Sequence, residues 1–411
     1  MTQSDSDRPH DLAGEIERLR RNSAHRSSGR GFELAEQWNA SSGEVDYLYR
    51  RDQLICESHD LERVLAAFDQ LGHDRPDDVT DGPAGLKILH VEGREAVDLA
   101  ESLAGLLGDD VVTLNHVLDA QGFPKMCPAT EPVPWQGPIL DFGEPVGPGR
   151  PRLAVIDTGY APSVRQDSSY GRLAAVEATS EIDDAVYGPA GVIIPYGGHG
   201  TATAARLLAV SGSNSVHVRV RDCLVGGAVD ELTIVEDLER VITDGVDIIS
   251  IQAGLHTHGG RPPKAFDAFS RQVLRHYPQI ILVVAAGNQG SDRPFWPAAY
   301  DWCTAVGALT HGGDARTGWT NYGYWVDVYA SGENIVVPFP NGTYTYLDGL
   351  QADFTQGHAI WSGTSFAAPV VAGMIARRMI ERNISAPDAR DVVLAEAAVA
   401  ALPATGPRVL V

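Results

Sequence analysis

Cysteine is scarce in this sequence of 411 residues, which contains only Cys56, Cys127, Cys223 and Cys303. The four show no Cys-x-x-Cys or other paired spacing, so we expect no disulfide framework. The first 30 residues are polar and charged and lack the apolar stretch of a secretory signal peptide. Together these features predict a cytoplasmic protein.

Long apolar runs and an excess of positive charge are also missing. No apolar run reaches the roughly 18 residues that a membrane-spanning helix needs, so we expect no membrane partner. The chain has 32 Lys and Arg residues against 54 Asp and Glu residues, a formal net charge of −22. Such an acidic protein is a poor partner for nucleic acids and for anionic membranes.

The sequence offers little to hold a cofactor or a metal. No strand is followed by a glycine-rich phosphate loop or a nicotinamide-binding fingerprint, so we predict no cofactor. His256 and His258 are spaced as metal ligands can be, but no third ligand lies near them in the sequence. We therefore predict no metal site.

The N-terminal part divides into a tail and a small domain. Residues 1–43 form a polar tail, in which Leu12, Ile16 and Leu19 fit one short amphipathic helix. The arginines that follow would suit an arm that docks on a partner or on the acidic body of the protein. Otherwise the tail is a solvated, frayed terminus.

Residues 44–119 predict a small α+β domain of ferredoxin-like pattern, with helices on one face of a sheet. Residues 45–49 and 53–56 are typical of strand, in one piece or as a hairpin, and the residues between 72 and 85 are predicted to form a loop. Apolar spacing and terminal glycines predict the remaining elements, namely helices at 60–71 and 95–107 and strands at 86–91 and 111–118.

A Pro- and Gly-rich linker at 120–151 leads into an α/β domain at 152–411. In that domain apolar strand runs alternate with amphipathic helices, which predicts a mostly parallel sheet covered by helices on both faces. We expect strands near 153–156, 216–221, 247–252, 280–285 and 302–308, and helices near 199–209, 229–243, 264–276, 364–381 and 387–400.

Four short stretches of this domain place a reactive side chain at the end of an element. A buried strand ends at Asp157, a histidine between glycines opens a helix at His199, and another strand ends at Asn288. Ser365 follows a compact turn at the start of a helix, where free backbone N–H groups favour negative charge. Pro369 is expected in the first turn of that helix, where its missing N–H is not needed.

Each residue has an ordinary structural explanation when it is taken alone. Asp157 could be a turn acid, His199 an idle helix-terminal residue, Ser365 a helix N-cap and Asn288 a turn residue. Taken together they provide an acid, a base, a nucleophile and an amide donor, which is the set that acyl transfer needs. We interpret them as one catalytic site.

This set resembles the subtilisin-like serine proteases, or subtilases, in its order Asp157, His199, Ser365. The matching stretches are IDTG at 156–159, HGT at 199–201, AAGN at 285–288 and SGTSFAAP at 362–369. The resemblance implies that Ser365 attacks a peptide carbonyl, His199 is the base, Asp157 orients it and Asn288 binds the oxyanion. It also implies that Gln252, Ala253 and Gly254 form one wall of the P1 pocket and pair with extended substrate, with Ala286 and Gly287 as the other wall.

The chain departs from that family at three places. Ala202 stands where most members have a second histidine after the general base, and Gln252 replaces a small residue, which changes the shape of the pocket. The connection after helix 199–209 is short and lacks the oxygen ligands that a calcium ion requires. The family's calcium site is therefore not expected here.

The resemblance further implies that residues 44–119 are a propeptide-type domain. We expect the linker after them to pass near Ser365, because proline-rich extended chain suits a substrate groove. In that case the N-terminal half holds the enzyme inactive or serves as a folding template. The competing interpretation is a permanent domain that senses a regulatory protein partner through residues 1–119. Two other classes of function remain open, a pseudoprotease that keeps only the fold and a peptide-processing transferase such as a macrocyclase.

Overall fold

The computed structural model describes residues 14, 16, 17, 19, 20, 32–41, 43–91, 93–119, 130–138, 151–165, 176–178, 186–188, 191–194, 196–211, 217–224, 227–346 and 349–410. Among these residues no helix is both long enough and apolar enough to cross a bilayer. The predicted helix of the tail falls partly on residues 14–20, and those of them that are described are helical. Ile16 and Leu19 are buried there against Val117 and Ala228.

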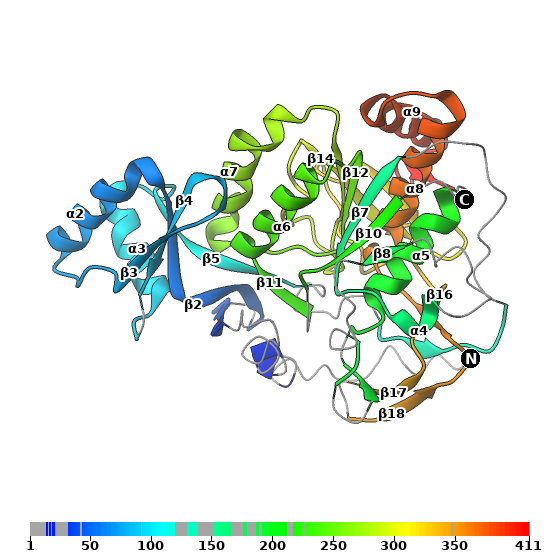
Figure 1. Ribbon diagram of the computed structural model, residues 1–411, viewed down its shortest axis with the longest axis horizontal. Coiled ribbons are helices and arrows are strands. Elements are labelled where there is room, and N and C mark those ends of the chain that lie inside the picture. The colour runs from blue at the N-terminus through cyan, green and yellow to red at the C-terminus, as the bar shows by residue number, and fades with distance from the viewer. Residues whose placement is uncertain are drawn as a thin grey trace.

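After one additional strand at its start, the N-terminal domain has the ferredoxin-like order β-α-β-β-α-β. Its elements are β1 (Leu34–Trp38), β2 (Val45–Glu57), α2 (Leu61–Leu71), β3 (Asp78–Asp81), β4 (Leu86–His90), α3 (Ala96–Leu107) and β5 (Val112–Asp119). The sheet order is β5-β2-β4-β3, and all of its neighbours are antiparallel. Helices α2 and α3 lie on one face of this sheet (Figure 1), and their buried side chains pack against it.

The structure decides one open alternative in this domain and differs from the sequence predictions at two other places. Residues 45–57 form one strand and not a hairpin, because β1 pairs with its first half while β4 pairs with its second half. Strand β1 lies in the stretch predicted as a polar tail. Residues 78–81, predicted as part of a loop, form the edge strand β3, which is too short and polar to show a period-2 pattern.

The second domain is built on a parallel sheet with the order β15-β14-β13-β12-β7-β10-β8. Its central strands are β7 (Arg152–Asp157), β10 (His217–Asp222), β12 (Ile248–Ile251), β13 (Ile281–Ala285), β14 (Cys303–Leu309) and β15 (Val328–Ser331). Two short strands extend it, β8 (Glu177–Ala178) and β20 (Arg408–Val409). The parallel pairing confirms the predicted α/β class.

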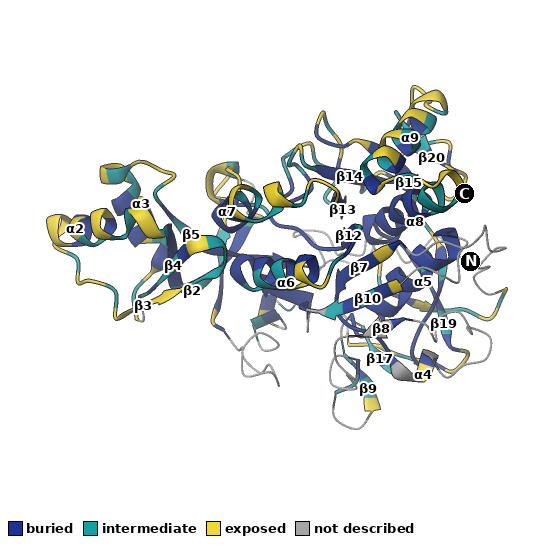
Figure 2. Ribbon diagram, turned by 45° about the horizontal axis from the view of Figure 1, so that its top comes forward, coloured by how far each residue is buried: buried dark blue, intermediate teal, exposed yellow. Residues whose placement is uncertain are grey.

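Helices cover both faces of this sheet, and the burial colours of Figure 2 show the sheet as the interior layer. One face packs against α5 (His199–Ser211), α8 (Thr364–Arg382) and α9 (Ala386–Val399), and the other against α6 (Glu231–Thr243) and α7 (Lys264–Gln272). Peripheral elements are α4 (Pro162–Arg165), β6 (Val133–Pro134), β9 (Val192–Ile193), β11 (Ala228–Asp230), β16 (Ile335–Pro338), β17 (Gly342–Thr345), β18 (Gln351–Phe354) and β19 (His358–Trp361).

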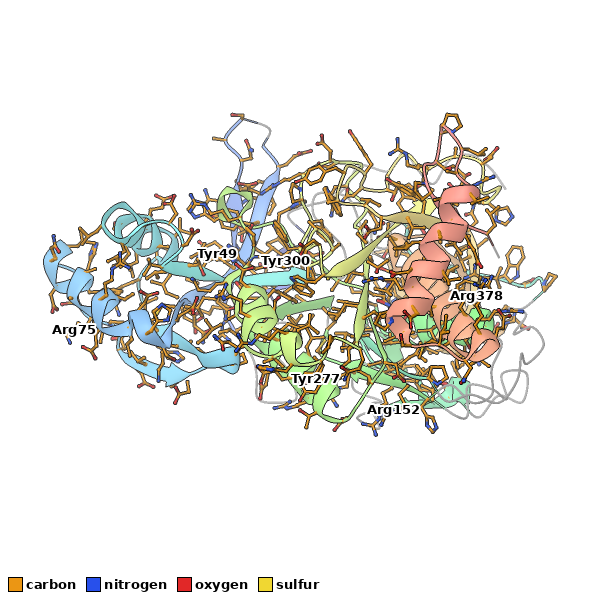
Figure 3. The ribbon with its side chains drawn as sticks, turned by 90° about the horizontal axis from the view of Figure 1, so that it is seen from above. Tyr49, Arg75, Arg152, Tyr277, Tyr300 and Arg378 are labelled. Atoms are coloured by element: carbon orange, nitrogen blue, oxygen red, sulfur yellow. The ribbon has the colours of Figure 1, made fainter. Side chains whose placement is uncertain are left out.

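The two domains share a buried interface. Ile55, Leu86 and Leu118 of the N-terminal sheet belong to the same apolar cluster as α6 and α7, so this sheet lies between its own helices and those of the second domain. Strand β11 of the second domain continues the N-terminal sheet by pairing with β5. In Figure 3, Tyr49 and Tyr300 lie near this junction, while Arg75 and Arg378 mark opposite ends of the molecule.

Candidate active site

Asp157 ends β7 at the carboxyl edge of the parallel sheet, and its side chain is fully buried. Its Oδ1 atom accepts hydrogen bonds from His199 Nδ1 and from the Thr158 backbone N–H, both at 2.6 Å. Its Oδ2 atom accepts from the hydroxyl of Thr203 at 2.8 Å. Three donors therefore hold this carboxylate in one orientation, as burial of a charge requires.

His199 is the first residue of α5, and it reaches Asp157 because the helix begins close to the end of β7. A Cβ atom on Gly200 would lie 2.2 Å from the Gly159 carbonyl oxygen, so only glycine permits this approach. Because a carboxylate can only accept, the His199 Nδ1 atom carries the proton, and Nε2 is the basic nitrogen. Nε2 is buried and has no hydrogen-bond partner among the described residues.

Ser365 is the second residue of α8, where the sequence predicts a helix N-terminus. The ring of the next residue, Phe366, lies 5.6 Å from the His199 ring, and the Trp361 ring stands edge-on to the same imidazole at 5.4 Å. The turn that carries Ser365 thus borders His199. Both residues are fully buried.

The position predicted for Pro369 is wrong. Helix α8 begins at Thr364, so Pro369 lies inside it, beyond the first turn. Proline has no backbone N–H, so residue 369 cannot donate the hydrogen bond that a regular helix makes to the carbonyl four residues earlier, at Ser365.

Asn288 follows β13, and two hydrogen bonds connect this loop to the start of α8. The Asn288 Oδ1 atom accepts from the Thr364 backbone N–H at 2.9 Å, and the Gly287 N–H donates to the Thr364 hydroxyl at 3.1 Å. Since Oδ1 is the accepting end, the Nδ2 group is the end of this amide that can donate to a substrate. These bonds anchor the Asn288 loop to Thr364, which directly precedes Ser365.

Sequence reasoning missed Asn321, which stabilises the Asn288 loop from a distant part of the chain. Its fully buried amide donates to the Ala286 carbonyl at 2.8 Å and to Gln289 Oε1 at 2.6 Å, and accepts from the Gln289 and Ser291 N–H groups at 3.0 and 3.1 Å. No local pattern singles out Asn321, since its partners are some 30 residues away. Thr203 was also missed, although its spacing of four from His199 on a helix is a usable signal.

The segment predicted to bind substrate, 252–254, continues from β12. Gln252 is buried, and its Nε2 group donates to Ser250 Oγ at 2.9 Å. Gly254 exchanges two backbone hydrogen bonds with Asp119 of the N-terminal domain, at 3.1 and 3.3 Å. The last residue of β5 therefore forms an antiparallel bridge with this segment.

His116, which precedes Asp119 on β5, makes a second contact between the domains. Glu231 Oε1 accepts from the backbone N–H and from the Nδ1 atom of His116, both at 3.0 Å, while its Oε2 accepts from the Ala265 N–H at 2.9 Å. The His116 Nε2 atom accepts from the His258 backbone N–H at 3.2 Å. Both ring nitrogens of His116 and the Oε1 atom of Glu231 are therefore paired across the interface, while Oε2 is paired within the second domain.

Part of the predicted linker lies beside the strand that leads to Ser365. Strand β6 pairs with β19 in antiparallel register, and the Thr130 carbonyl accepts from Trp361 Nε1 at 2.6 Å. The Thr130 hydroxyl accepts from the Ser362 N–H at 3.2 Å. The rest of the linker falls largely outside the described residues.

No group of three or more His, Cys, Asp or Glu side chains that could hold a metal occurs in the part of the chain that the structure describes. His256 donates from Nδ1 to the Pro294 carbonyl at 3.1 Å, and His258 stacks on Tyr47. Cys56 and Cys303 are buried thiols, and burial raises the pKa of Cys56 to about 11.

Residues 150–405 match the model of the subtilase family, which is more than half of the chain. The chain belongs to the subtilase family of serine proteases. This confirms the resemblance drawn from the four motifs, and the parallel sheet of the second domain agrees with it.

Several curated proteins are similar to this subtilase. Subtilisin DY of Bacillus licheniformis is 28% identical over 240 residues, covering 55% of this chain and 75% of its own length. The intracellular serine protease of Paenibacillus polymyxa is 28% identical over 260 residues, covering 58% and 71%. A thermophilic serine proteinase of Bacillus sp. (strain AK1) is 41% identical over 96 residues, but the chain spans only 20% of that relative.

Among solved structures, fervidolysin from Fervidobacterium pennivorans, a keratinolytic enzyme related to subtilisin, aligns with a TM-score of 0.58. The alignment covers 91% of this chain and 61% of fervidolysin at 16% identity. At that identity the likeness shows the fold alone.

Proposed function

We propose that this subtilase is a serine endopeptidase in which Ser365, His199, Asp157 and Asn288 carry the reaction. The observation that supports this most strongly is the hydrogen bonding of the two His199 ring nitrogens. Its Nδ1 atom is bound to a buried carboxylate, and its buried Nε2 atom has no hydrogen-bond partner in the described part of the chain. A basic nitrogen left in that condition is suited to take a proton from a serine hydroxyl.

The proposed reaction gives each of these four residues one role. The Ser365 hydroxyl attacks the peptide carbonyl, and His199 takes its proton and later gives it to the leaving amine. Asp157 keeps the imidazole in the tautomer with the proton on Nδ1 and stabilises its positive charge. The Asn288 Nδ2 group and the backbone N–H at Ser365 receive the negative charge that develops on the carbonyl oxygen.

We further propose that the N-terminal domain regulates this site. Asp119 pairs with Gly254 where extended substrate would pair, and residues 130–134 lie along β19 on the way to Ser365. Both contacts support this proposal, because Asp119 and residues 130–134 lie beside segments that a peptide substrate would approach, whereas residues 120–129 lie outside the described part of the chain. Ion pairs between basic residues of the second domain and acidic residues of the first support docking, namely Arg293–Asp46, Arg271–Glu57 and Arg261–Asp109.

The proposed endopeptidase activity is tested by incubating a proteome-derived peptide library with the wild type and with Ser365→Ala. New N-termini produced by the wild type alone, each from hydrolysis, are the expected result. Ligated or cyclised products would instead favour a peptide-processing transferase. No products from either protein, together with a folded wild type, would favour a pseudoprotease or a partner-dependent module.

A further inference from the structure

The aromatic ring of Phe295 lies between the two segments assigned to the walls of the P1 pocket. A Cβ atom built on Gly254, in one wall, would lie 2.2 Å from Cε1 of this ring. A Cβ atom built on Gly287, in the other wall, would lie 2.9 Å from its Cδ1 atom. The ring therefore packs directly against the Cα atoms of both glycines, in the space that separates the two segments.

Backbone hydrogen bonds hold the chain at Phe295 and at the residue after it. Leu255 and Trp296 exchange backbone hydrogen bonds at 2.8 and 2.9 Å, which join the residue after Phe295 to the residue after Gly254. The Phe295 carbonyl accepts from the Ala299 N–H at 2.9 Å. The ring therefore cannot leave the pocket by a shift of its own loop without breaking these bonds.

The ring itself is also held in place. Phe295 is 3% exposed, and the imidazole of His256 stands against it in an edge contact at 5.3 Å. His256 is oriented by its Nδ1 hydrogen bond to the Pro294 carbonyl. Burial, with a smaller effect from Arg293, lowers the pKa of His256 to about 3, so a neutral imidazole packs on the phenyl ring near neutral pH.

We propose that Phe295 fills the P1 pocket and makes this protease selective for peptides with a small P1 side chain, namely Gly, Ala or Ser. The proposal rests on the endopeptidase function proposed above and names its substrate class. A closely packed interior has no room for a second large side chain beside the phenyl ring. A small P1 residue needs little of that space and still leaves the scissile carbonyl at Ser365.

Substrate affinity must then come from contacts other than the P1 side chain. The Gly254 N–H and C=O groups already pair with an extended segment, residue Asp119, so the backbone edge of this wall is suited to a peptide strand. Backbone pairing of this kind gives affinity without a preference for one side chain. The preference at P1 therefore arises mainly because the Phe295 ring excludes large P1 side chains.

The test uses the full chain and a set of peptides that differ only at P1, with Ala, Ser, Leu, Phe or Lys. kcat/KM is normalised to the fraction of Ser365 that a fluorophosphonate labels. One methylene in an apolar pocket changes kcat/KM by about 10–200-fold, so the wild type should prefer Ala to Phe by about 100-fold or more. A wild type that cleaves best after Phe or Leu would overturn the proposal.

Two variants test the role of the ring itself. Phe295→Gly should raise kcat/KM for the P1 Phe and P1 Leu peptides by about 100-fold relative to the P1 Ala peptide. Phe295→Leu keeps most of the packing and should show a smaller change in the same direction. Phe266→Leu is the matched control. Phe266 lies on α7, and its fully buried ring belongs to the same apolar cluster as Phe295. Its P1 profile should equal that of the wild type.

The outcomes separate this inference from the function on which it rests. If Ser365 is labelled and peptides are cleaved, but both Phe295 variants keep the wild-type profile, the assignment of Phe295 is wrong and the endopeptidase function stands. If Ser365 is not labelled and no peptide of the set is cleaved, both proposals fail.

Discussion

Asp119, the last residue of the N-terminal sheet, exchanges two backbone hydrogen bonds with Gly254, at 3.1 and 3.3 Å. The pairing connects the end of one domain to the segment where the other would hold a peptide. A tethered domain has a high effective concentration at such a site, so a modest intrinsic affinity is enough for near-complete occupancy. Whether this tether is cut decides between the two forms of regulation proposed for the domain.

If the N-terminal domain is a propeptide, the wild type should cut its own chain between about residues 119 and 151. The intact mass of the purified wild type, followed over time, should show this loss, while Ser365→Ala should stay at full length. A wild type that remains uncut and still hydrolyses peptides at its full rate would contradict the inhibitory role. A permanent partner-sensing domain would then take its place.

Replacing Asn288 by Ala should lower kcat much more than it raises KM, because the amide is proposed to bind the oxyanion only as charge develops. The expected loss in kcat is on the order of 10²–10³-fold, which is the magnitude measured when the oxyanion-hole asparagine of a subtilisin is replaced. Steady-state kinetics on one peptide measure it. An effect confined to KM would show that this amide contacts the ground state and not the oxyanion.

Replacing Thr203 by Val should destabilise the protein, since the Oδ2 atom of the buried Asp157 loses its hydroxyl donor. A hydrogen bond to a charged group contributes about 1.5–3 kcal/mol, and the free energy of unfolding should fall by about that amount. Urea unfolding in the Ser365→Ala background avoids self-digestion. Thr203→Ser keeps the hydroxyl and should restore most of the stability, whereas equal losses in both variants would indicate a packing effect alone.

Chelation should leave thermal stability nearly unchanged, since the described residues contain no cluster of metal ligands. A metal bound at 100 times its Kd would contribute about 2.7 kcal/mol of stability, which is enough to shift Tm by several degrees. Thermal unfolding of Ser365→Ala with and without EDTA measures the difference. A large drop in Tm with EDTA would reveal a metal site elsewhere in the chain.

The parallel sheet and its helices could be predicted because their signals are local. The apolar runs at 153–156 and 280–285 are buried strands in the structure, and the helix predicted near 199–209 is α5 with His199 as its first residue. The predicted start of α6, near residue 229, is too early, because Asp230 is the N-cap of this helix and its side chain accepts from the Thr233 N–H. Its neighbours Ala228 and Val229 form part of β11.

What could not be predicted depends on contacts between distant parts of the chain. The polar stretch around Arg50 and Asp52 looks like a turn, but β2 runs through it because two partner strands pair with its two halves. Asn321 and Phe295 carry no motif of their own. Their importance follows from the loops against which they pack, which only the fold brings together.

The central claim, that Ser365 is the nucleophile of an active endopeptidase, is tested most directly by a fluorophosphonate probe followed by peptide mapping. We expect one adduct, located on Ser365, with a matching loss of peptide hydrolysis. Ser365→Ala, whose folded state is checked by circular dichroism, should show no adduct and no hydrolysis. Hydrolysis by Ser365→Ala at the wild-type rate, or an adduct on another residue, would contradict the account.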